Sequence, residues 1–423
     1  MIAVVAPSIL SGFVNIPTSK SAMQRACALS LLSNGTTIIY NPGKSNDDLA
    51  ALDIIEKLGA KVQYNNNSIT IISTGDIGTP TFINCHESGL SLRMFTPIIA
   101  ISKNGVTISG TGSLMKRPIE LFSHFFAELG VDIKSENGLL PIDIKGPLQP
   151  VDIEIDGSKS SQYLTGLLFA FARKVDKLTV ITVRNLVSKP YIDLSIQLMN
   201  HFGFKVVNDH YERFLIYPKT EVNIDVSYTV EGDWSSASFF IVAAAIAGDL
   251  SLSGLNFNSC QSDRKILDVL DQINVNYSIN GDILKIQHST VIKSFKFDAT
   301  DCPDLFPPLV VLALAAKGKS EIKGVNRLFD KESNRAEALM NQFSKLGADI
   351  FVLDDNMIII GGEKLNGGVV NSQHDHRIAM ALAIAGLITS AEVIIEDSES
   401  VNKSFPDFFN LLQHCGGLVT LKT

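Results

Sequence analysis

Charged and polar side chains gather at the start of a predicted helix near the N-terminus of this chain. In the stretch PTSKSAMQRACAL, Lys20 and Arg25 follow a proline that ends an apolar run, and small apolar residues then recur at helical spacing. Free backbone N–H groups at a helix N-terminus attract anions, and a lysine there adds a full positive charge. Ser19 could equally be an ordinary helix cap beside a solvated lysine. This stretch alone leaves anion binding and simple capping both open.

The same polar pattern returns at other helix starts. Counting the first, six helix starts carry polar groups, among them Lys20, Ser21, Arg25, Arg93, Ser160, Ser161, Gln162, Asp304, Asp375, His376 and Arg377. The turns before a second set of helices carry Lys116, Arg117, Lys331, Glu332, Arg335 and Lys403. Each turn by itself is typical of a helix cap or an exposed charged turn. So many lysines and arginines in such turns, in a chain with a formal charge of -8, predict a site for a ligand that carries phosphate and carboxylate groups.

Composition narrows the possible functions. The chain has 423 residues, 45% of them hydrophobic, which is enough to bury the cores of two or more domains. Its acidic balance and single tryptophan argue against a nucleic-acid partner. No apolar run approaches the roughly 20 residues that span a bilayer, and the N-terminus lacks the basic segment of a signal peptide. We therefore expect a cytoplasmic protein with no membrane partner.

The sequence lacks the usual signatures of nucleotide and metal sites. It has neither a GxxxxGK[ST] loop nor a GxGxxG turn. Its five cysteines are scattered, with no C-x-x-C pair, which argues against a disulfide framework and a structural zinc site. His374 and His376 lie close together without a pattern of further ligands, so no metal site is predicted there.

A short pattern that ends a helix and begins a strand occurs six times. Its central residues are Gly59, Gly130, Gly203, Asn274, Gly347 and Gly416, at a spacing of about 70 residues. Glycine and asparagine suit the left-handed position that ends many helices. Within one period the pattern reads strand, helix, strand, helix, strand, strand, and the first period begins with the strand GFVNI. The chain is therefore predicted to be an α/β (α+β) protein of six βαβαββ repeats.

The two ends of the chain predict how the repeats combine. The sixth repeat stops one strand short, whereas MIAVVAP adds a spare strand before the first repeat. If that strand completes the sixth repeat, residues 1–16 and 228–423 form one domain with repeats four to six, and residues 17–227 form the other with repeats one to three. The chain then crosses between the domains near residues 12–18 and 222–230. Two crossings make a hinge, and we expect the active site in a cleft between the domains.

Nine longer motifs follow one another along the chain: SKSAMQR, SGLSLRMF, LMKRPIE, GSKSSQYLTGLL, SKPYIDLSIQLM, VEGDWSSASFF, DKESNRAEAL, HDHRIAMALA and KSFPDFF. In this order they are similar to the motifs of the 5-enolpyruvylshikimate-3-phosphate (EPSP) synthase family, and the resemblance covers essentially the whole chain. It implies two domains of three βαβαββ units each that close around substrate. It also implies transfer of the enolpyruvyl group of phosphoenolpyruvate to the 5-hydroxyl of shikimate 3-phosphate. We expect a monomer that needs no cofactor or metal and is inhibited by glyphosate.

The resemblance further implies a role for each matching position. Residues that would bind shikimate 3-phosphate are Lys20, Ser21, Arg25, Ser160, Ser161, Gln162, Ser188, Tyr191, Asp304 and Lys331. Residues that would bind phosphoenolpyruvate are Lys20, Gly89, Arg117, Gln162, Arg335, Arg377 and Lys403, with Arg93 and His376 in support. Of the catalytic residues, we expect Asp304 to take the proton of the attacking hydroxyl. Glu332 and Lys20 would share proton transfer at C3 of phosphoenolpyruvate.

The chain departs from the family pattern beside Gly89. Glu87 and Leu90 replace the usual asparagine and threonine, and Met94 replaces a proline. A carboxylate near an anion pocket opposes a dianionic ligand, so we expect weaker glyphosate inhibition than in a relative with the usual residues. The cationic residues match the family pattern, so the expected reaction class is unchanged.

Two other functions stay open at this point. One is that of the sister enolpyruvyl transferase, which acts on UDP-N-acetylglucosamine. At the start of its first helix that enzyme carries Lys-Asn, where this chain has Lys20 and Ser21. The other is a noncatalytic, anion-binding or scaffolding role. Asp304 and Glu332 argue against a mere binder, because acids in a basic cleft do not help to bind an anion.

Overall fold

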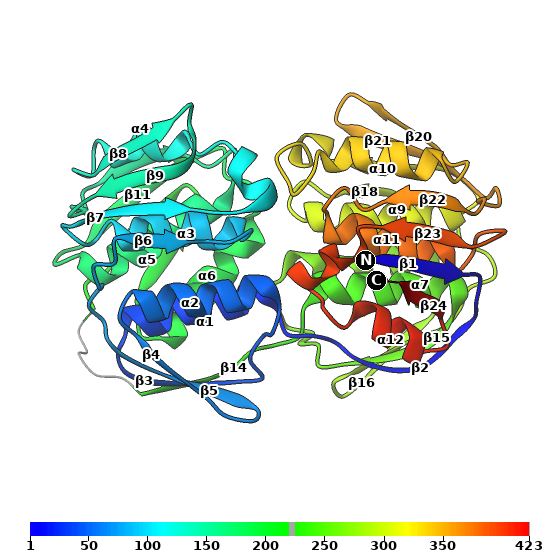
Figure 1. Ribbon diagram of the computed structural model, residues 1–423, viewed down its shortest axis with the longest axis horizontal. Coiled ribbons are helices and arrows are strands. Elements are labelled where there is room, and N and C mark those ends of the chain that lie inside the picture. Colours follow the sequence, from blue (N-terminus) through cyan, green and yellow to red (C-terminus); the bar gives the residue numbers. More distant parts are fainter. Residues whose placement is uncertain (220–224, 423) are drawn as a thin grey trace. The chain divides into compact units, whose positions relative to one another are not determined.

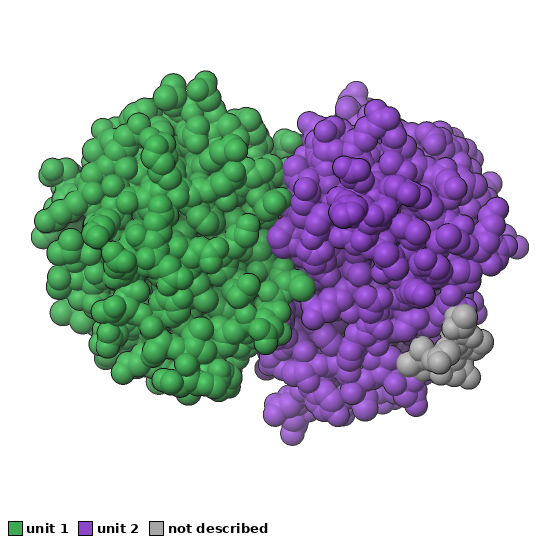
Figure 2. Space-filling model, turned by 180° about the vertical axis from the view of Figure 1, so that it is seen from behind, with its two compact units in different colours: residues 1–17, 232–423 green, residues 18–231 purple. Residues whose placement is uncertain are grey.

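The computed structural model of this protein describes residues 1–219 and 225–422. Along the chain, two helices separated by a strand are followed by a run of strands, and this order recurs as the repeat pattern predicts (Figure 1). The chain forms two compact units, which Figure 2 colours separately. Unit 1 comprises residues 1–17 and 232–423, and unit 2 comprises residues 18–231.

The described residues of unit 2 form three four-stranded sheets, each with both parallel and antiparallel strands. The strands of one sheet are, in order, β14 (Val226–Thr229), β3 (Asn34–Tyr40), β5 (Ser68–Thr74) and β4 (Lys61–Tyr64). Those of the second are β6 (Phe82–Asn84), β7 (Gly105–Ser109), β9 (Leu139–Lys145) and β8 (Asp132–Glu136). Those of the third are β10 (Ile153–Asp156), β11 (Thr179–Arg184), β13 (Arg213–Ile216) and β12 (Val206–Asp209). The accompanying helices are α1 (Lys20–Leu32), α2 (Asn46–Lys57), α3 (Gly89–Ile99), α4 (Leu121–Phe126), α5 (Ser161–Lys174) and α6 (Lys189–His201). Each sheet starts with a parallel pair and continues antiparallel, which is the pairing that a βαβαββ repeat produces.

Unit 1 repeats this architecture, again with three sheets in the part that the structure describes. The strands of one sheet are, in order, β2 (Leu10–Asn15), β15 (Gly248–Ser253), β17 (Ile283–Ile286) and β16 (Tyr277–Asn280). Those of the second are β18 (Lys296–Asp298), β19 (Gly318–Lys323), β21 (Asn356–Gly361) and β20 (Asp349–Leu353). Those of the third are β22 (Gly368–Asn371), β23 (Val393–Glu396), β1 (Ile2–Ala6) and β24 (Leu418–Lys422). The helices are α7 (Trp234–Ala247), α8 (Ile266–Ile273), α9 (Phe306–Ala315), α10 (Arg335–Ser344), α11 (His376–Gly386) and α12 (Phe408–His414).

The N-terminal strand completes the sixth repeat, as predicted. β1 lies between β23 and β24 and pairs antiparallel with both. This pairing brings the two ends of the chain close together (Figure 1).

The prediction that the strand GFVNI begins the first repeat is wrong. It lies in β2, which pairs in parallel with β15 in unit 1, while β14 takes the matching place beside β3 in unit 2. The chain passes between the units directly after each of these strands, so each strand remains in the unit that the chain is leaving. The predicted domain limits differ from the unit limits by one residue at the first crossing (16 against 17) and by four at the second (227 against 231). Of the second predicted crossing, residues 222–224 lie outside the described residues.

Helices α7, α9 and α11 form the interior of unit 1. Every residue of α7 and α11 is buried, and so are the first nine residues of α9 (Phe306–Leu314). A helix that is apolar on all sides is expected in a core rather than at a surface. The three helices contact one another, and the ring of Phe240 in α7 packs against Phe405 and Phe408. This packing fixes the N-terminal ends of the helices relative to one another.

Candidate active site

The N-terminal ends of α7, α9 and α11 carry three polar side chains that contact one another. Arg377, the second residue of α11, donates from Nη1 to the Oγ atom of Ser235 in α7. Its Nη2 donates to Oδ2 of Asp304 at 3.0 Å. Asp304 lies in a short 3₁₀ helix (Pro303–Leu305) that leads into α9. The three buried helices therefore present a carboxylate and a guanidinium at one place.

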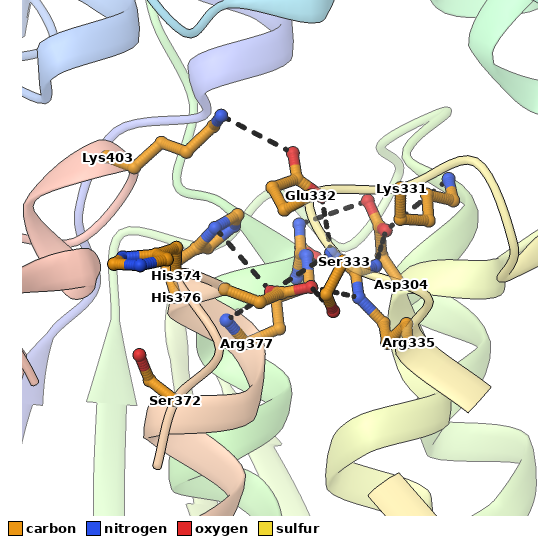
Figure 3. Close-up of polar contacts among 12 residues, drawn as sticks. Asp304, Lys331, Glu332, Ser333, Arg335, Ser372, His374, His376, Arg377 and Lys403 are labelled. Carbon is orange, nitrogen blue, oxygen red and sulfur yellow. Dashed lines mark hydrogen bonds and ion pairs between the residues drawn. The ribbon is translucent and has the colours of Figure 1, made fainter. Parts of the chain in front are cut away.

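Arg335, the first residue of α10, lies at the centre of the cluster in Figure 3. Its Nη1 donates to Oδ1 of Asp304 at 2.9 Å, and its Nη2 donates to Oε2 of Glu332 at 2.6 Å. Nε donates to Oδ2 of Asp375 at 2.9 Å. One buried guanidinium thus binds carboxylates from three separate turns, and charge-assisted bonds of this kind are the strong ones.

Two lysines complete the cluster. The Nζ atom of Lys331 lies 3.8 Å from Oδ1 of Asp304, and the Nζ atom of Lys403 lies 3.7 Å from Oε1 of Glu332. Lys403 ends a 3₁₀ helix (Ser398–Lys403). Asp304, Lys331, Glu332, Arg335, Arg377 and Lys403, which the sequence predicts as site residues, are therefore in contact through ion pairs (Figure 3).

The cluster changes the acidity of its members. Burial acts to raise the pKa of Asp304, but the positive charges of Arg377, Lys331 and Arg335 outweigh it and hold this pKa well below its usual range. Burial lowers the pKa of Lys331 to about 8, although Asp304 opposes the shift. Asp304 is therefore ionised at neutral pH, while Lys331 loses its proton in mildly alkaline solution. Strongly shifted groups of this kind are typical of functional sites.

Asp375 and His376 lie at the start of α11. Asp375 caps the helix, since its side chain accepts from the backbone N–H of Arg377. His376 is 1% exposed, and its Nδ1 atom lies 3.9 Å from Oδ1 of Asp375. The structure therefore places His376 beside the cluster.

In unit 2, Lys20 is the first residue of α1 and pairs with the start of α2. Its Nζ atom donates to Oδ2 of Asp47 at 2.9 Å, and both side chains are largely buried. The neighbouring Asp48 forms a capping box with Ser45. Burial raises the pKa of Asp48 to about 7, although its bonds with Ser45 oppose the shift. Lys20 thus lies beside two buried carboxyl groups.

Arg25 is held one turn further along α1. Its Nε donates to Oγ of Ser195 at 2.8 Å, Nη1 donates to the carbonyl of Ser21 at 2.8 Å, and Nη2 donates to the carbonyl of Tyr191 at 3.4 Å. Burial lowers the pKa of Arg25 to about 10, so the group stays charged at neutral pH. Ser188, which precedes α6, has a left-handed backbone with a φ of 54°. Among the predicted residues, Ser21, Arg25 and Tyr191 are therefore brought together.

Helices α3 and α5 bring a second group together. Arg93 in α3 donates from Nη1 to Oε1 of Gln162 at 3.0 Å, and Ser160 caps α5. Gly89 begins α3 with its Cα facing two cations: a Cβ there would lie 2.8 Å from Nη1 of Arg117 and 3.0 Å from Nη1 of Arg93. Ser161, the first residue of α5, is buried. The absence of a side chain at Gly89 leaves room for both guanidiniums.

Two of the three residues that depart from the expected pattern are buried. Leu90 is 6% exposed, Met94 is fully buried, and both belong to the interior of unit 2. The carboxylate of Glu87 lies over Gly112, where an added Cβ would overlap its Oε1 atom.

Comparison with known proteins shows the family of this chain. A family model, that of EPSP synthase (3-phosphoshikimate 1-carboxyvinyltransferase), matches residues 4–412. A 3-phosphoshikimate 1-carboxyvinyltransferase of Clostridium novyi (strain NT) is 35% identical, over 98% of this chain and 97% of its own. One of Clostridium perfringens (strain ATCC 13124) is also 35% identical, over 98% of each chain. The chain belongs to the EPSP synthase family.

Solved structures support the same fold for this EPSP synthase family member. An EPSP synthase from Acinetobacter baumannii superposes with a TM-score of 0.82 at 25% identity, over 100% of both chains. The enolpyruvyl transferase NikO from Streptomyces tendae superposes with a TM-score of 0.80 over 99% of this chain and 98% of its own, and at 16% identity it shows the fold alone. The predictions of family, fold class and transferase class are therefore confirmed.

Several polar residues that contact predicted site residues of this EPSP synthase family member were assigned no site role from the sequence, although Asp375 was noted at a helix start. Among them, Asp47, Ser235 and Asp375 bind Lys20, Arg377 and Arg335 respectively. Each lies at a helix start, where capping explains an aspartate or a serine, so the sequence offered no separate signal. The described residues contain no group of histidine, cysteine and acidic side chains that could hold a metal ion. Among the described helices, none combines the length and the apolar character needed to cross a membrane.

Proposed function

We propose that this member of the EPSP synthase family transfers the enolpyruvyl group of phosphoenolpyruvate to the 5-hydroxyl of shikimate 3-phosphate and releases phosphate. The observation that carries the proposal is the cluster in unit 1, where Asp304 and Glu332 both bind Arg335. Cations for an anionic substrate and carboxylates for proton transfer thus belong to one set of contacts. The names of the two Clostridium relatives state the same activity.

Two proton transfers define the proposed chemistry. The hydroxyl of shikimate 3-phosphate loses a proton as its oxygen bonds to C2 of phosphoenolpyruvate, while C3 gains a proton, and a tetrahedral intermediate forms. The bond from C2 to the phosphate oxygen then breaks, and C3 loses a proton. Carboxylates and a lysine can carry out these transfers. We assign the hydroxyl proton to Asp304 and the C3 proton to Glu332 and Lys20.

The substrate-binding residues we propose are divided between the two units. For phosphoenolpyruvate they are Arg335, Arg377 and Lys403 of unit 1 with Lys20, Gly89, Arg117 and Gln162 of unit 2, supported by Arg93 and His376. For shikimate 3-phosphate they are Asp304 and Lys331 of unit 1 with Lys20, Ser21, Arg25, Ser160, Ser161, Gln162, Ser188 and Tyr191 of unit 2. Fixed cations stabilise the charge that develops on the departing phosphate. Each substrate therefore needs both units.

We also propose that the enzyme works as a monomer in the cytoplasm. All the proposed site residues lie in one chain, so a second copy is not needed to complete the site. Light scattering after size-exclusion chromatography should then give the mass of one chain, 45.9 kDa. Twice that mass would contradict the monomer.

Release of phosphate from phosphoenolpyruvate tests the proposed function. The purified protein should release phosphate when shikimate 3-phosphate is added, and product analysis should show the enolpyruvyl ether of that acceptor. UDP-N-acetylglucosamine should give no release above the background without acceptor. Release with UDP-N-acetylglucosamine alone would identify the sister transferase instead. Absence of release with either acceptor would indicate a protein that only binds anions.

A further inference from the structure

Asp375 is fully buried and binds Arg335 through both of its oxygens. Oδ2 accepts from Nε of Arg335 at 2.9 Å, and Oδ1 accepts from Nη2 at 3.2 Å. Ser333 donates its hydroxyl to Oδ2 at 3.2 Å, and the backbone N–H of Arg377 donates to Oδ1 at 2.9 Å. Each oxygen of Asp375 thus has two donors. Both Asp375 and Arg335 are 0% exposed, so neither side chain is free to turn toward solvent.

This contact decides which edge of Arg335 faces the carboxylates of the cluster. A guanidinium carries five N–H donors in a fixed plane. Asp375 occupies the edge formed by Nε and Nη2. The other edge, formed by Nη1 and Nη2, faces Asp304 and Glu332. An anion that binds Arg335 at two points must therefore use this second edge and take the place of Asp304 or Glu332.

We propose that Asp375 is a positioning residue for phosphoenolpyruvate binding. It holds the edge of Arg335 formed by Nε and Nη2, so that the second edge, formed by Nη1 and Nη2, is presented to the substrate anion. The inference rests on the proposed function, because it takes phosphoenolpyruvate as the anion. Asp375 acts through Arg335 and does not itself touch the substrate. Loss of Asp375 therefore weakens phosphoenolpyruvate binding and leaves shikimate 3-phosphate binding largely intact.

Helix capping alone does not account for this geometry. Capping uses a single bond, from the backbone N–H of Arg377 to Oδ1. Serine caps other helices of this chain at Ser19, Ser45 and Ser88. A buried carboxylate is unfavourable unless it is paired and fully hydrogen-bonded, whereas a serine carries no such penalty. The carboxylate at residue 375 is therefore explained by its pairing with Arg335.

Two substitutions separate positioning from capping. Asp375→Ser keeps a capping oxygen but leaves a single side-chain oxygen, which cannot bind both Nε and Nη2 of Arg335, and Asp375→Asn keeps the size but removes the charge. We expect each to raise the KM for phosphoenolpyruvate by about 10- to 100-fold, the effect of losing a charged hydrogen bond. The KM for shikimate 3-phosphate should change by less than about threefold, and kcat by less than the KM for phosphoenolpyruvate.

Asn334→Ala provides the matched control. Asn334 is exposed and caps α10, the helix that carries Arg335. Its loss therefore weakens a helix start in the same cluster and leaves the two hydrogen bonds between Asp375 and Arg335 in place. We expect this variant to melt a few degrees lower. Its KM for phosphoenolpyruvate should stay near that of the unmodified enzyme. Circular dichroism confirms that each variant is folded before its kinetics are compared.

A double-mutant cycle identifies Arg335 as the residue through which Asp375 acts. Arg335→Lys removes the guanidinium that makes two hydrogen bonds to Asp375. Adding Asp375→Asn to this variant should therefore raise the KM for phosphoenolpyruvate little further. Fully multiplicative effects would overturn the inference, as would an unchanged or lower KM in the single Asp375 variants. If the unmodified protein itself released no phosphate with shikimate 3-phosphate, the proposed function would fail instead, so the two failures are distinct.

Discussion

Asp304 receives hydrogen bonds from both Arg335 and Arg377. These cations, with Lys331, hold its pKa well below the usual range against the opposing effect of burial. A carboxylate with a low pKa is ionised and can accept a proton, but it is a weak base. An anionic substrate that draws the guanidiniums away from Asp304 would raise this pKa toward the working pH. In this account, substrate binding and activation of the base are coupled.

The first prediction concerns the two acids. Asp304→Asn and Glu332→Gln keep the size of each side chain and remove its charge, so each should lower kcat by about 100-fold or more. Binding of shikimate 3-phosphate should be nearly unchanged, which isothermal titration calorimetry can measure. If either variant turned over substrate at the normal rate, its catalytic assignment would be withdrawn.

The second prediction concerns pH. Burial lowers the pKa of Lys331 to about 8, so its ammonium is charged below that pH and neutral above it. An anion binds the charged form better, and the affinity for shikimate 3-phosphate should therefore fall as the pH rises from 7 to 9. The substrate phosphate is already about nine-tenths ionised at pH 7, since its second pKa is about 6, and its further ionisation would act against the fall. Lys331→Arg keeps its charge and should lose this pH dependence, whereas an equal fall in that variant would assign it to another group.

At the level of elements, α3 presents Gly89 to two guanidiniums. The Cβ of an alanine would lie 2.8 Å from Arg117 and 3.0 Å from Arg93, at the far ends of flexible side chains. The guanidiniums can move, so the fold should survive, but the proposed phosphoenolpyruvate site changes shape. Beside Gly89, the carboxylate of Glu87 lies over Gly112. Weaker glyphosate inhibition than in a relative with the usual residues stays a prediction.

The third prediction follows from this geometry. Gly89→Ala should raise the KM for phosphoenolpyruvate by about tenfold and change the free energy of unfolding by less than about 1 kcal/mol. Gly105→Ala serves as its control, because the nearest atom to an added Cβ there is 4.0 Å away. Steady-state kinetics and urea denaturation measure both quantities. Equal KM values for the two variants would remove Gly89 from the proposed site.

At the level of the whole molecule, the proposed site residues are divided between two units of one chain. The fourth prediction is that saturating shikimate 3-phosphate lowers the radius of gyration measured by X-ray scattering, because the ligand draws on residues of both units. Arg25→Ala, which weakens the proposed site in unit 2 alone, should require more ligand for the same change. A radius of gyration that did not respond to saturating ligand would contradict the division of the site.

The repeats were predictable because their signals are local. Each helix end and each alternating strand lies within one period of about 70 residues, and the cations at the helix starts share one position in that period. The exchange of β2 and β14 was not predictable, because the strand GFVNI has the same pattern at the edge of either sheet. The bond between Arg335 and Asp375 spans 40 residues of sequence, and only tertiary packing determines it. Local patterns thus predicted the elements and the candidate residues, but neither the exchange of β2 and β14 nor the side-chain contacts of the site.

Enolpyruvyl transfer cleaves the bond between C2 and oxygen in phosphoenolpyruvate. Phosphoenolpyruvate labelled with oxygen-18 in the bridge between C2 and phosphorus shows whether this protein cleaves that bond. Incubated with shikimate 3-phosphate, the enzyme should release phosphate that carries the label, and mass spectrometry of the phosphate would detect it. Unlabelled phosphate together with labelled pyruvate would show hydrolysis at phosphorus and would contradict enolpyruvyl transfer.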